Sequence, residues 1–158
     1  MVLGILAVLG VAGPANAATP IPPKAMWIGQ QAPVDDVVSW ATAHGVRDLF
    51  VAYPGGPPDL TWYRALRTRA DRAKLTMSAL GGDPTWATNP AAASRWADLA
   101  RRTGLFSGLH VDVEPYALPA WSTDQATVVR GYLQLLTQLR AQPLPVEYDV
   151  PFWYSTIV

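Results

Sequence analysis

The segment Ser107–Tyr116 reads SGLHVDVEPY. Leucine and valine occupy every second position, and the residues between them are His110, Asp112 and Glu114. Side chains alternate between the two faces of a β-strand, so a strand here buries its apolar row and directs one imidazole and two carboxylates to the opposite face. Carboxylates are rarely buried without a partner, and such costly arrangements concentrate at functional sites. Because Pro115 cannot donate to a sheet ladder, the strand is predicted to end at Glu114, and parallel α/β folds carry their chemistry at such carboxyl ends.

Strand and helix patterns alternate along the rest of the chain. Apolar runs bounded by glycine or proline predict five strands, at residues 25–29, 49–53, 75–80, 108–114 and 146–153. Amphipathic patterns predict four helices, at residues 33–43, 60–73, 90–103 and 122–141. Ser122 and Gln125 have the spacing of a capping box at the start of the last helix. Strict alternation implies an α/β protein with a parallel sheet and right-handed crossovers.

The length of the repeat favours a barrel. Each strand–helix unit takes roughly 25–35 residues, as in a (β/α)8 barrel, which needs about 250 residues in all. We therefore expect a TIM-barrel type of fold, of which residues 18–158 form the N-terminal part with about five strands and four helices. An open doubly wound sheet is the alternative. Against it, Gln30-Gln31-Ala32 follows the first strand, where a glycine-rich phosphate loop would stand.

Composition excludes several kinds of site. The chain has 12 basic and 12 acidic residues, and no stripe of Lys and Arg that would favour a nucleic-acid partner. It has no cysteine, which excludes disulfides, thiolate catalysis and Cys-based zinc sites. His44 and His110 are its two histidines, too few for a His-rich metal site, so neither a metal nor another cofactor is expected.

The first 17 residues resemble an export signal. Val2 to Val11 form an apolar run, and Ala15-Asn16-Ala17 has the small-x-small pattern of a cleavage site. A buried first strand and a membrane anchor are the alternatives, but the run is too short to span a bilayer. We expect a signal peptide at residues 1–17, a secreted domain at 18–158, and no stable membrane span after cleavage.

The fourth predicted strand resembles the signature of family 18 glycoside hydrolases, the chitinase family. Their pattern is Asp-Gly-x-Asp-x-Asp-x-Glu on strand four of a (β/α)8 barrel. Gly108, Asp112 and Glu114 match it, whereas Ser107 and His110 stand where the family has acids. The resemblance implies that Glu114 is the general acid and that Asp112 orients the acetamido group of the substrate, which acts as internal nucleophile.

Two further stretches carry weaker resemblances. Ser78–Gly82 is similar to the family's Ser-x-Gly-Gly on strand three, with one extra residue. Val113-Glu114-Pro115 resembles the Asn-Glu-Pro triplet of a large glycosidase clan, without its asparagine. The nucleophile of that clan lies on strand seven, beyond this chain. Both families imply the same role for Glu114, that of the acid.

Glycoside cleavage needs a proton donor and a second group at the anomeric carbon. Asp112 lies on the same wall as Glu114, so it is predicted to support catalysis rather than to flank the sugar. Asp83 and Asp149 are the candidates at other strand ends. His110 is interpreted as a hydrogen-bonded partner of Asp112. A structural ion-pair cluster of the two acids with His110 or an arginine is the alternative.

Aromatic residues gather at the same predicted strand ends. Sugars stack on aromatic faces, and the candidates to bind substrate, together with Asp149, are Tyr53, Trp86, Tyr116, Trp121 and Trp153. Trp27 lies near the end of the first strand. These features predict a secreted glycoside hydrolase-like protein that needs no cofactor and has a carbohydrate as partner. The alternatives are a non-catalytic carbohydrate-binding barrel and a cell-wall hydrolase acting on another bond, such as an amide.

Overall fold

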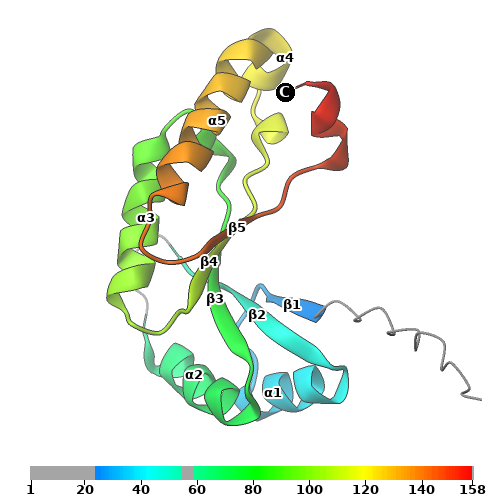
Figure 1. The fold of residues 1–158 in the computed structure, drawn as a ribbon, viewed down its shortest axis with the longest axis vertical. Coiled ribbons are helices and arrows are strands. Elements are labelled where there is room, and N and C mark those ends of the chain that lie inside the picture. Colours follow the sequence, from blue (N-terminus) through cyan, green and yellow to red (C-terminus); the bar gives the residue numbers. More distant parts are fainter. Residues whose placement is uncertain (1–23, 55–58, 158) are drawn as a thin grey trace, which may run out of the picture.

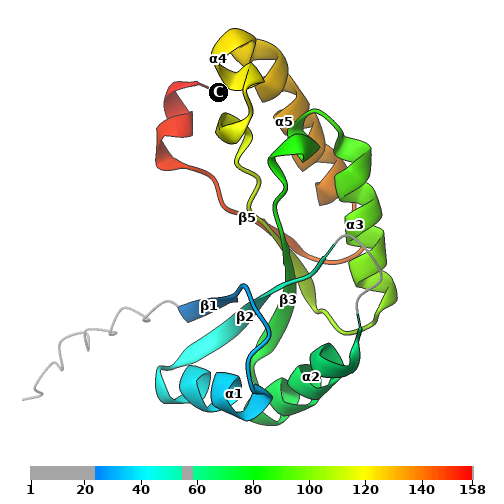
Figure 2. The same ribbon diagram turned by 180° about the vertical axis from the view of Figure 1, so that it is seen from behind.

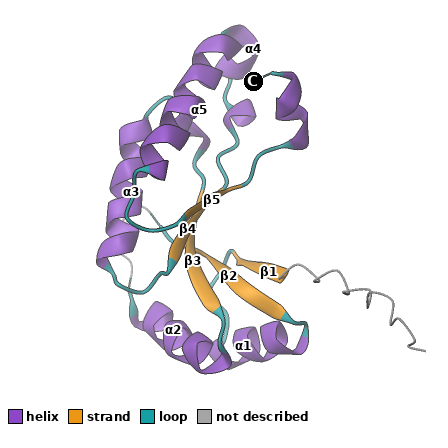
Figure 3. Ribbon diagram, in the orientation of Figure 1, coloured by secondary structure: helices purple, strands orange, loops and turns teal. Residues whose placement is uncertain are grey.

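A five-stranded parallel sheet forms the centre of the molecule. The computed structural model describes residues 24–54 and 59–157, so the export signal expected at residues 1–17 lies outside the described residues. The strands are β1 (Lys24–Ile28), β2 (Val46–Ala52), β3 (Thr76–Gly81), β4 (Gly108–Val111) and β5 (Val146–Tyr148). They pair in the order β1-β2-β3-β4-β5, and every neighbouring pair is parallel (Figures 1 and 3). The prediction of an α/β chain with a parallel sheet is confirmed.

Helices connect the strands and share one side of the sheet. They are α1 (Val34–Ala43), α2 (Thr61–Ala73), α3 (Pro90–Arg102), α4 (Ala120–Thr123) and α5 (Gln125–Arg140). Three short 3-10 helices follow strand ends: η1 (Pro84–Ala87), η2 (Pro115–Ala117) and η3 (Phe152–Thr156). Because the strand order never reverses, right-handed crossovers bring every helix to the same side, with α1 beside α2 and α3 beside α5 (Figures 1 and 2). Doubly wound sheets differ, since their strand order reverses and helices cover both sides.

The core lies between the sheet and the helices. Alternate residues of the three central strands point into it and are at most 1% exposed: Leu49, Val51, Met77, Ala79, Leu109 and Val111. The helices meet them with the fully buried Leu66 of α2, Ala97 of α3 and Leu135 of α5. This row fits the period-two pattern expected of a strand with one buried face. The opposite face of the sheet, which no helix of the described residues covers, is called the open face below.

One glycine sets the position of α5. A Cβ on Gly131 would lie 2.0 Å from the carbonyl oxygen of Ala87, which ends η1. The backbones of α5 and η1 are therefore in direct contact. That contact fixes α5 against the segment that follows β3.

Two predicted strands end earlier than expected. The prediction that β4 runs to Glu114 is wrong, because its neighbour β3 stops at Gly81 and leaves one more ladder bond, from Asp112 N to Gly81 O at 2.9 Å. The prediction that β5 reaches Trp153 is also wrong. After Tyr148 the chain leaves the sheet and turns into η3.

The last predicted helix is two helices. The chain breaks at Asp124, between α4 and α5, and the carboxylate of Asp124 accepts a hydrogen bond from the Thr127 backbone N–H at 3.2 Å. The predicted capping box of Ser122 and Gln125 is therefore wrong. The aspartate between them is the stronger N-cap because its oxygen reaches the free N–H groups of the first turn.

Candidate functional site

A buried histidine lies at the middle of the open face. His110 of β4 is 4% exposed, and it is the one polar or charged residue that is buried in the described part of the chain. Its ring stacks on Phe50 of β2, with the ring centroids 3.6 Å apart and the planes at 16°. Trp27 of β1 meets the same ring edge-on at 5.9 Å. Two aromatic side chains from neighbouring strands thus cover the imidazole.

Both ring nitrogens of His110 face carboxylates. Nε2 lies 2.9 Å from Oδ2 of Asp149, and Nδ1 lies 3.4 Å from Oε2 of Glu147. The register explains this geometry, because His110 pairs with Glu147 across the β4–β5 ladder and Asp149 stands two residues further along the same row. The prediction that His110 bonds Asp112 is wrong, since residues two apart on one strand are roughly 6–7 Å apart.

A hollow of about 350 Å³ opens beside Asp149, at the carboxyl ends of β4 and β5. Three carboxylates, two aromatic rings and three apolar residues line it: Asp112, Glu114, Asp149, Trp27, Tyr116, Val113, Val150 and Pro151. We call it the carboxylate hollow. It has no basic side chain in its lining. The structure thus brings together Asp112, Glu114 and Asp149, which the sequence had marked as candidates.

Glu114 and Tyr116 form one wall of the carboxylate hollow. Glu114 is exposed and stands at the N-terminal end of η2, just beyond the strand. The Tyr116 hydroxyl donates a hydrogen bond to Oε1 of Glu114. This bond, with smaller contributions from burial and from the carboxylates, raises the pKa of Tyr116 to about 12. The tyrosine is therefore a neutral donor that orients the carboxylate at physiological pH.

Asp112 is partly buried, whereas Glu114 in the same wall is exposed. Burial raises the pKa of its carboxyl, and the negative charges of Glu114 and Asp149 raise it further, while His110 acts in the opposite direction. The loop after β3 contacts the backbone of Asp112 closely. A Cβ on Gly82 would lie 1.9 Å from the Asp112 carbonyl oxygen. Only glycine fits so close to Asp112, which fixes the backbone below the hollow.

Two buried tyrosines lie under the carboxylates. Tyr132 of α5 and Tyr154 of η3 meet edge-on at 5.9 Å. Burial, followed by the nearby charge of Asp112, raises the pKa of Tyr132 to about 12. Burial also raises the pKa of Tyr154, whose hydroxyl has no hydrogen-bond partner within the described residues. Neither tyrosine belongs to the lining of the carboxylate hollow itself.

Comparison with protein-family models, with curated proteins and with solved structures gives no match for this chain. The resemblance to family 18 therefore rests on the sequence, on Gly108, Asp112 and Glu114 and on the weaker match at Ser78–Gly82.

Two of the predicted aromatic residues lie away from the carboxylate hollow. Tyr53 is 6% exposed and packs edge-on against Tyr63 and Phe106 in the core. Trp86 is 8% exposed and packs against Trp96 at 5.1 Å. The structure places both beside the helices rather than on the open face.

Trp121 and Trp153 lie behind the hollow rather than in its lining. Trp153 meets Tyr116 edge-on at 5.4 Å, and Trp121 meets Trp153 at 6.2 Å and stacks on Tyr154 at 6.0 Å. This cluster joins η2, α4 and η3. It supports the wall that carries Tyr116.

Asp83 has a local structural role. Its carboxylate accepts hydrogen bonds from the backbone N–H and the hydroxyl of Thr85, at 2.8 and 2.7 Å, and so caps η1. These bonds lower the pKa of Asp83. Of the two candidates for a further carboxylate, Asp149 lines the hollow and Asp83 does not.

Sequence reasoning missed Glu147 and Tyr132. Glu147 could have been found, because Glu147 and Asp149 are two apart and so share a face of the last strand. Tyr132 had no such signal, since it lies in the apolar row of a helix. Its place below Asp112 depends on how α5 packs against the sheet.

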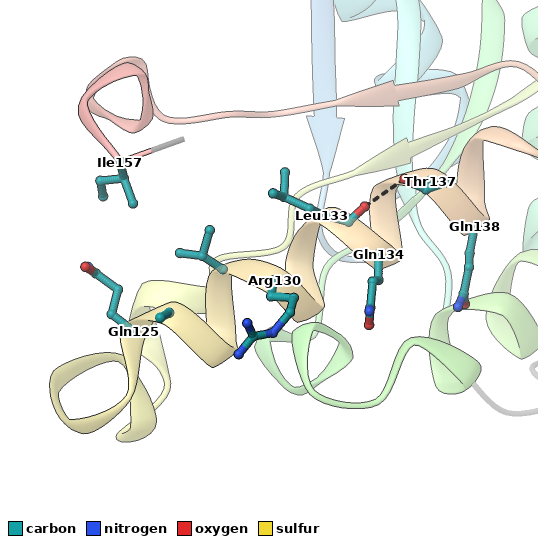
Figure 4. Close-up of a pocket in the computed structure, with 9 residues that line it drawn as sticks. Gln125, Arg130, Leu133, Gln134, Thr137, Gln138 and Ile157 are labelled. Carbon is teal, nitrogen blue, oxygen red and sulfur yellow. Dashed lines mark hydrogen bonds between the residues drawn. The ribbon is translucent and has the colours of Figure 1, made fainter.

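A larger hollow lies elsewhere, on the outer side of α5. It has a volume of about 950 Å³, and Figure 4 shows its polar side chains and Ile157 around an open space. Its lining holds one ionisable side chain, Arg130, and no carboxylate. We therefore regard the smaller carboxylate hollow as the candidate active site.

The structure contains neither a metal-ligand cluster nor a membrane-spanning helix in the parts it describes. Within residues 24–54 and 59–157, no group of three or more His, Asp or Glu side chains could hold a metal ion. In the same ranges no helix combines the length and the apolar character that crossing a bilayer requires.

Proposed function

We propose that the carboxylate hollow binds a carbohydrate and that the chain is a glycoside hydrolase-like protein with Glu114 as general acid. The observation that carries this proposal is the lining of the hollow, which combines three carboxylates with an exposed tryptophan and a tyrosine. Sugar rings present apolar faces that stack on aromatic side chains, and glycoside cleavage uses carboxyl groups. Trp27 is 53% exposed and borders the same space as Glu114.

We extend the proposal to the fold. The sequential order of parallel strands, with all helices on one side, is the arrangement of a (β/α)8 barrel. In such barrels the active site lies at the carboxyl ends of the strands, as the carboxylate hollow does. The open face would then line the barrel interior. The export signal expected at residues 1–17 places this activity outside the cell.

The three acids would have different roles. Glu114 is exposed at the mouth, where one carboxylate oxygen is held by Tyr116 and the other is available to a leaving group. Asp112, deeper and with a raised pKa, supports it, and in the family 18 resemblance it orients an acetamido group. Asp149 follows β5, so it reaches the hollow from another strand end than Asp112 and Glu114, which follow β4.

Replacing Glu114 by Gln in the full-length protein tests the proposal. We expect turnover, measured as reducing ends released from soluble polysaccharides and from N-acetylglucosamine oligomers, to fall by about 10²–10⁴-fold. Binding of the same sugars, measured by quenching of tryptophan fluorescence, should persist. Asp83→Asn is the matched control, because Asp83 caps η1 outside the hollow, and it should leave turnover unchanged.

Two results would count against the proposed reaction. Unchanged turnover in Glu114→Gln would remove Glu114 as the acid. Fluorescence quenching without any release by the wild-type protein would favour a non-catalytic carbohydrate-binding protein. One observation favours that second function: the carboxylates come from two adjacent strand ends, β4 and β5, rather than from opposite sides of the sheet.

A further inference from the structure

His110 is held more rigidly than the carboxylates that it contacts. Its side chain is 5% exposed, against 41% for Asp149 and 64% for Glu147. The ring is stacked on Phe50 and closed by the edge of Trp27, so it cannot rotate without displacing one of them. The carboxylate of Asp149 lies at the rim and would be free to turn toward solvent. In this contact the histidine is the fixed partner and the aspartate is the one that is held.

The chemistry of the two contacts gives the direction of the bonds. An ionised carboxylate only accepts hydrogen bonds, and a neutral imidazole has a single N–H to donate. The shorter contact, 2.9 Å from Nε2 to Asp149, is the one with the length of a charge-assisted bond. The single N–H is therefore on Nε2 and donates to Asp149. A second proton, on Nδ1, would donate to Glu147, whose contact is longer at 3.4 Å.

We propose that His110 is a positioning residue for the site, holding Asp149 in the carboxylate hollow through its Nε2–H. The bond occupies Oδ2 of Asp149, and Oδ1 has no hydrogen-bond partner among the described residues, so it can meet a ligand. This role rests on the proposed function, in which Asp149 supplies the carboxylate from outside the β4 wall. Glu147 contacts the other ring nitrogen and does not line the carboxylate hollow, so its side chain is linked to the site through His110.

The surroundings of His110 contain few charges. Trp27 and Phe50 cover it from β1 and β2, and its register partner on β3 is Leu80. The titratable groups that face it are Asp112, just beyond β4, and the two acids of the β5 segment, Glu147 and Asp149. Asp48 of β2 lies further along the open face, in a hollow of about 220 Å³ that Glu147 also lines. The electrostatic effect of any charge on His110 is therefore strongest at Asp149, Glu147 and Asp112.

A double-mutant cycle between His110 and Asp149 tests the proposal. We expect His110→Leu, which has no donor, to lower kcat by about 10-fold or more with little change in KM, and Asp149→Asn to do the same. If His110 acts through Asp149, the double variant should be no slower than Asp149→Asn alone. His110→Gln keeps an N–H near the position of Nε2 and should recover most of the loss. Multiplied losses in the double variant would overturn the proposal.

A second readout does not depend on turnover. In the wild-type protein and in Glu147→Gln, the Nε2–H proton of His110, followed by NMR, should resonate downfield and exchange slowly with solvent, because it is hydrogen-bonded to the Asp149 carboxylate. In Asp149→Asn the same proton should move upfield. The backbone N–H of Asp149, bonded to Val111 O at 3.0 Å, should stay protected from exchange and so report that β5 is still paired.

These measurements separate the two proposals. If the wild-type protein neither binds nor cleaves sugars, the proposed function fails, and the NMR measurement still decides whether His110 holds Asp149. If sugars are cleaved but the Nε2–H resonance of His110 is unchanged in Asp149→Asn, the positioning role is wrong and the hydrolase proposal stands.

Discussion

At the scale of single residues, the site is distinguished by acids in unlike surroundings. Asp112 and Asp83 both follow strands at the same edge of the sheet, yet their pKa values shift in opposite directions. Asp83 accepts two hydrogen bonds from Thr85, which favour its charged form. Asp112 is half-buried beside other negative charges, which favour its protonated form. Sequence position alone does not indicate the direction of either pKa shift. The environment of each carboxyl in the structure does.

The two shifts predict opposite effects of pH on stability. Because the folded-state pKa of Asp112 is raised above its ordinary value of 3.8, the folded chain binds more protons than the unfolded chain between the two pKa values. The protonated Asp112 carboxyl therefore contributes its full stability below the unfolded pKa. This contribution to the free energy of unfolding is lost as pH rises through the folded pKa. Asp112→Asn should therefore gain stability relative to the wild-type protein as pH rises above 3.8, and it should keep that gain at neutral pH. The gain should be below about 1 kcal/mol, because solvent screens a half-exposed carboxyl.

Urea denaturation at a series of pH values measures this difference. Asp83→Asn is the control of opposite sign. The pKa of Asp83 is lowered in the folded chain, so its ionised carboxylate stabilises the fold above the unfolded pKa. This contribution is lost as pH falls through the folded pKa. Asp83→Asn should therefore lose stability relative to the wild-type protein at neutral pH, and the loss should vanish in acid. Curves for Asp112→Asn and wild type that run parallel at every pH would contradict the pKa assigned to Asp112.

At the scale of the elements, the close approach of α5 to η1 carries a testable cost. Alanine normally stabilises a helix by about 1 kcal/mol relative to glycine. At Gly131 the new Cβ would stand 2.0 Å from the Ala87 carbonyl oxygen, a backbone atom that cannot rotate away. We expect Gly131→Ala to lower the free energy of unfolding by about 1–3 kcal/mol, as overpacking of a well-packed contact does.

The midpoint of urea denaturation measures this cost. Gln134→Ala, on the exposed side of the same helix, is the control and should change stability by no more than about 0.5 kcal/mol. If Gly131→Ala is as stable as the wild-type protein, α5 and η1 do not touch as the structure places them.

The elements themselves were largely predictable, and their ends were not. Period-two and helical patterns reveal which segments are strands and helices, since they record one buried side. The end of β4 depends on where its neighbour β3 stops, which no pattern within 108–114 records. The start of a helix at Asp124 could have been predicted, because an aspartate just before an amphipathic run is an N-cap signal. The period also disfavoured Tyr53 as a site residue, since it has the parity of the buried Leu49 and Val51.

At the scale of the whole molecule, the sheet has two unlike sides. One side is covered by helices and holds the apolar core (Figure 2). The open face carries Phe50, His110 and Trp27, with the carboxylate hollow at one edge. Sequence analysis located this edge through the acids of residues 107–116. It could not show that Trp27, from the other end of the sheet order, borders the same hollow, because that follows from the curvature of the sheet.

The two sides of the sheet can be compared directly with two tryptophans of nearly equal exposure. Trp27 is 53% exposed on the open face, and Trp40 is 51% exposed on α1, where it stacks on His44 at 3.9 Å. If ligands bind in the carboxylate hollow, Trp27→Ala should weaken sugar binding roughly 3- to 10-fold, the loss expected for one aromatic stacking contact. Trp40→Ala should leave affinity unchanged. Titration of each variant with N-acetylglucosamine oligomers and with cellodextrins, followed by calorimetry, gives both affinities without relying on either fluorophore. Equal losses in the two variants, or a loss confined to Trp40→Ala, would move the binding site away from the open face, because only Trp27 lies beside the acids that would act on a bound sugar.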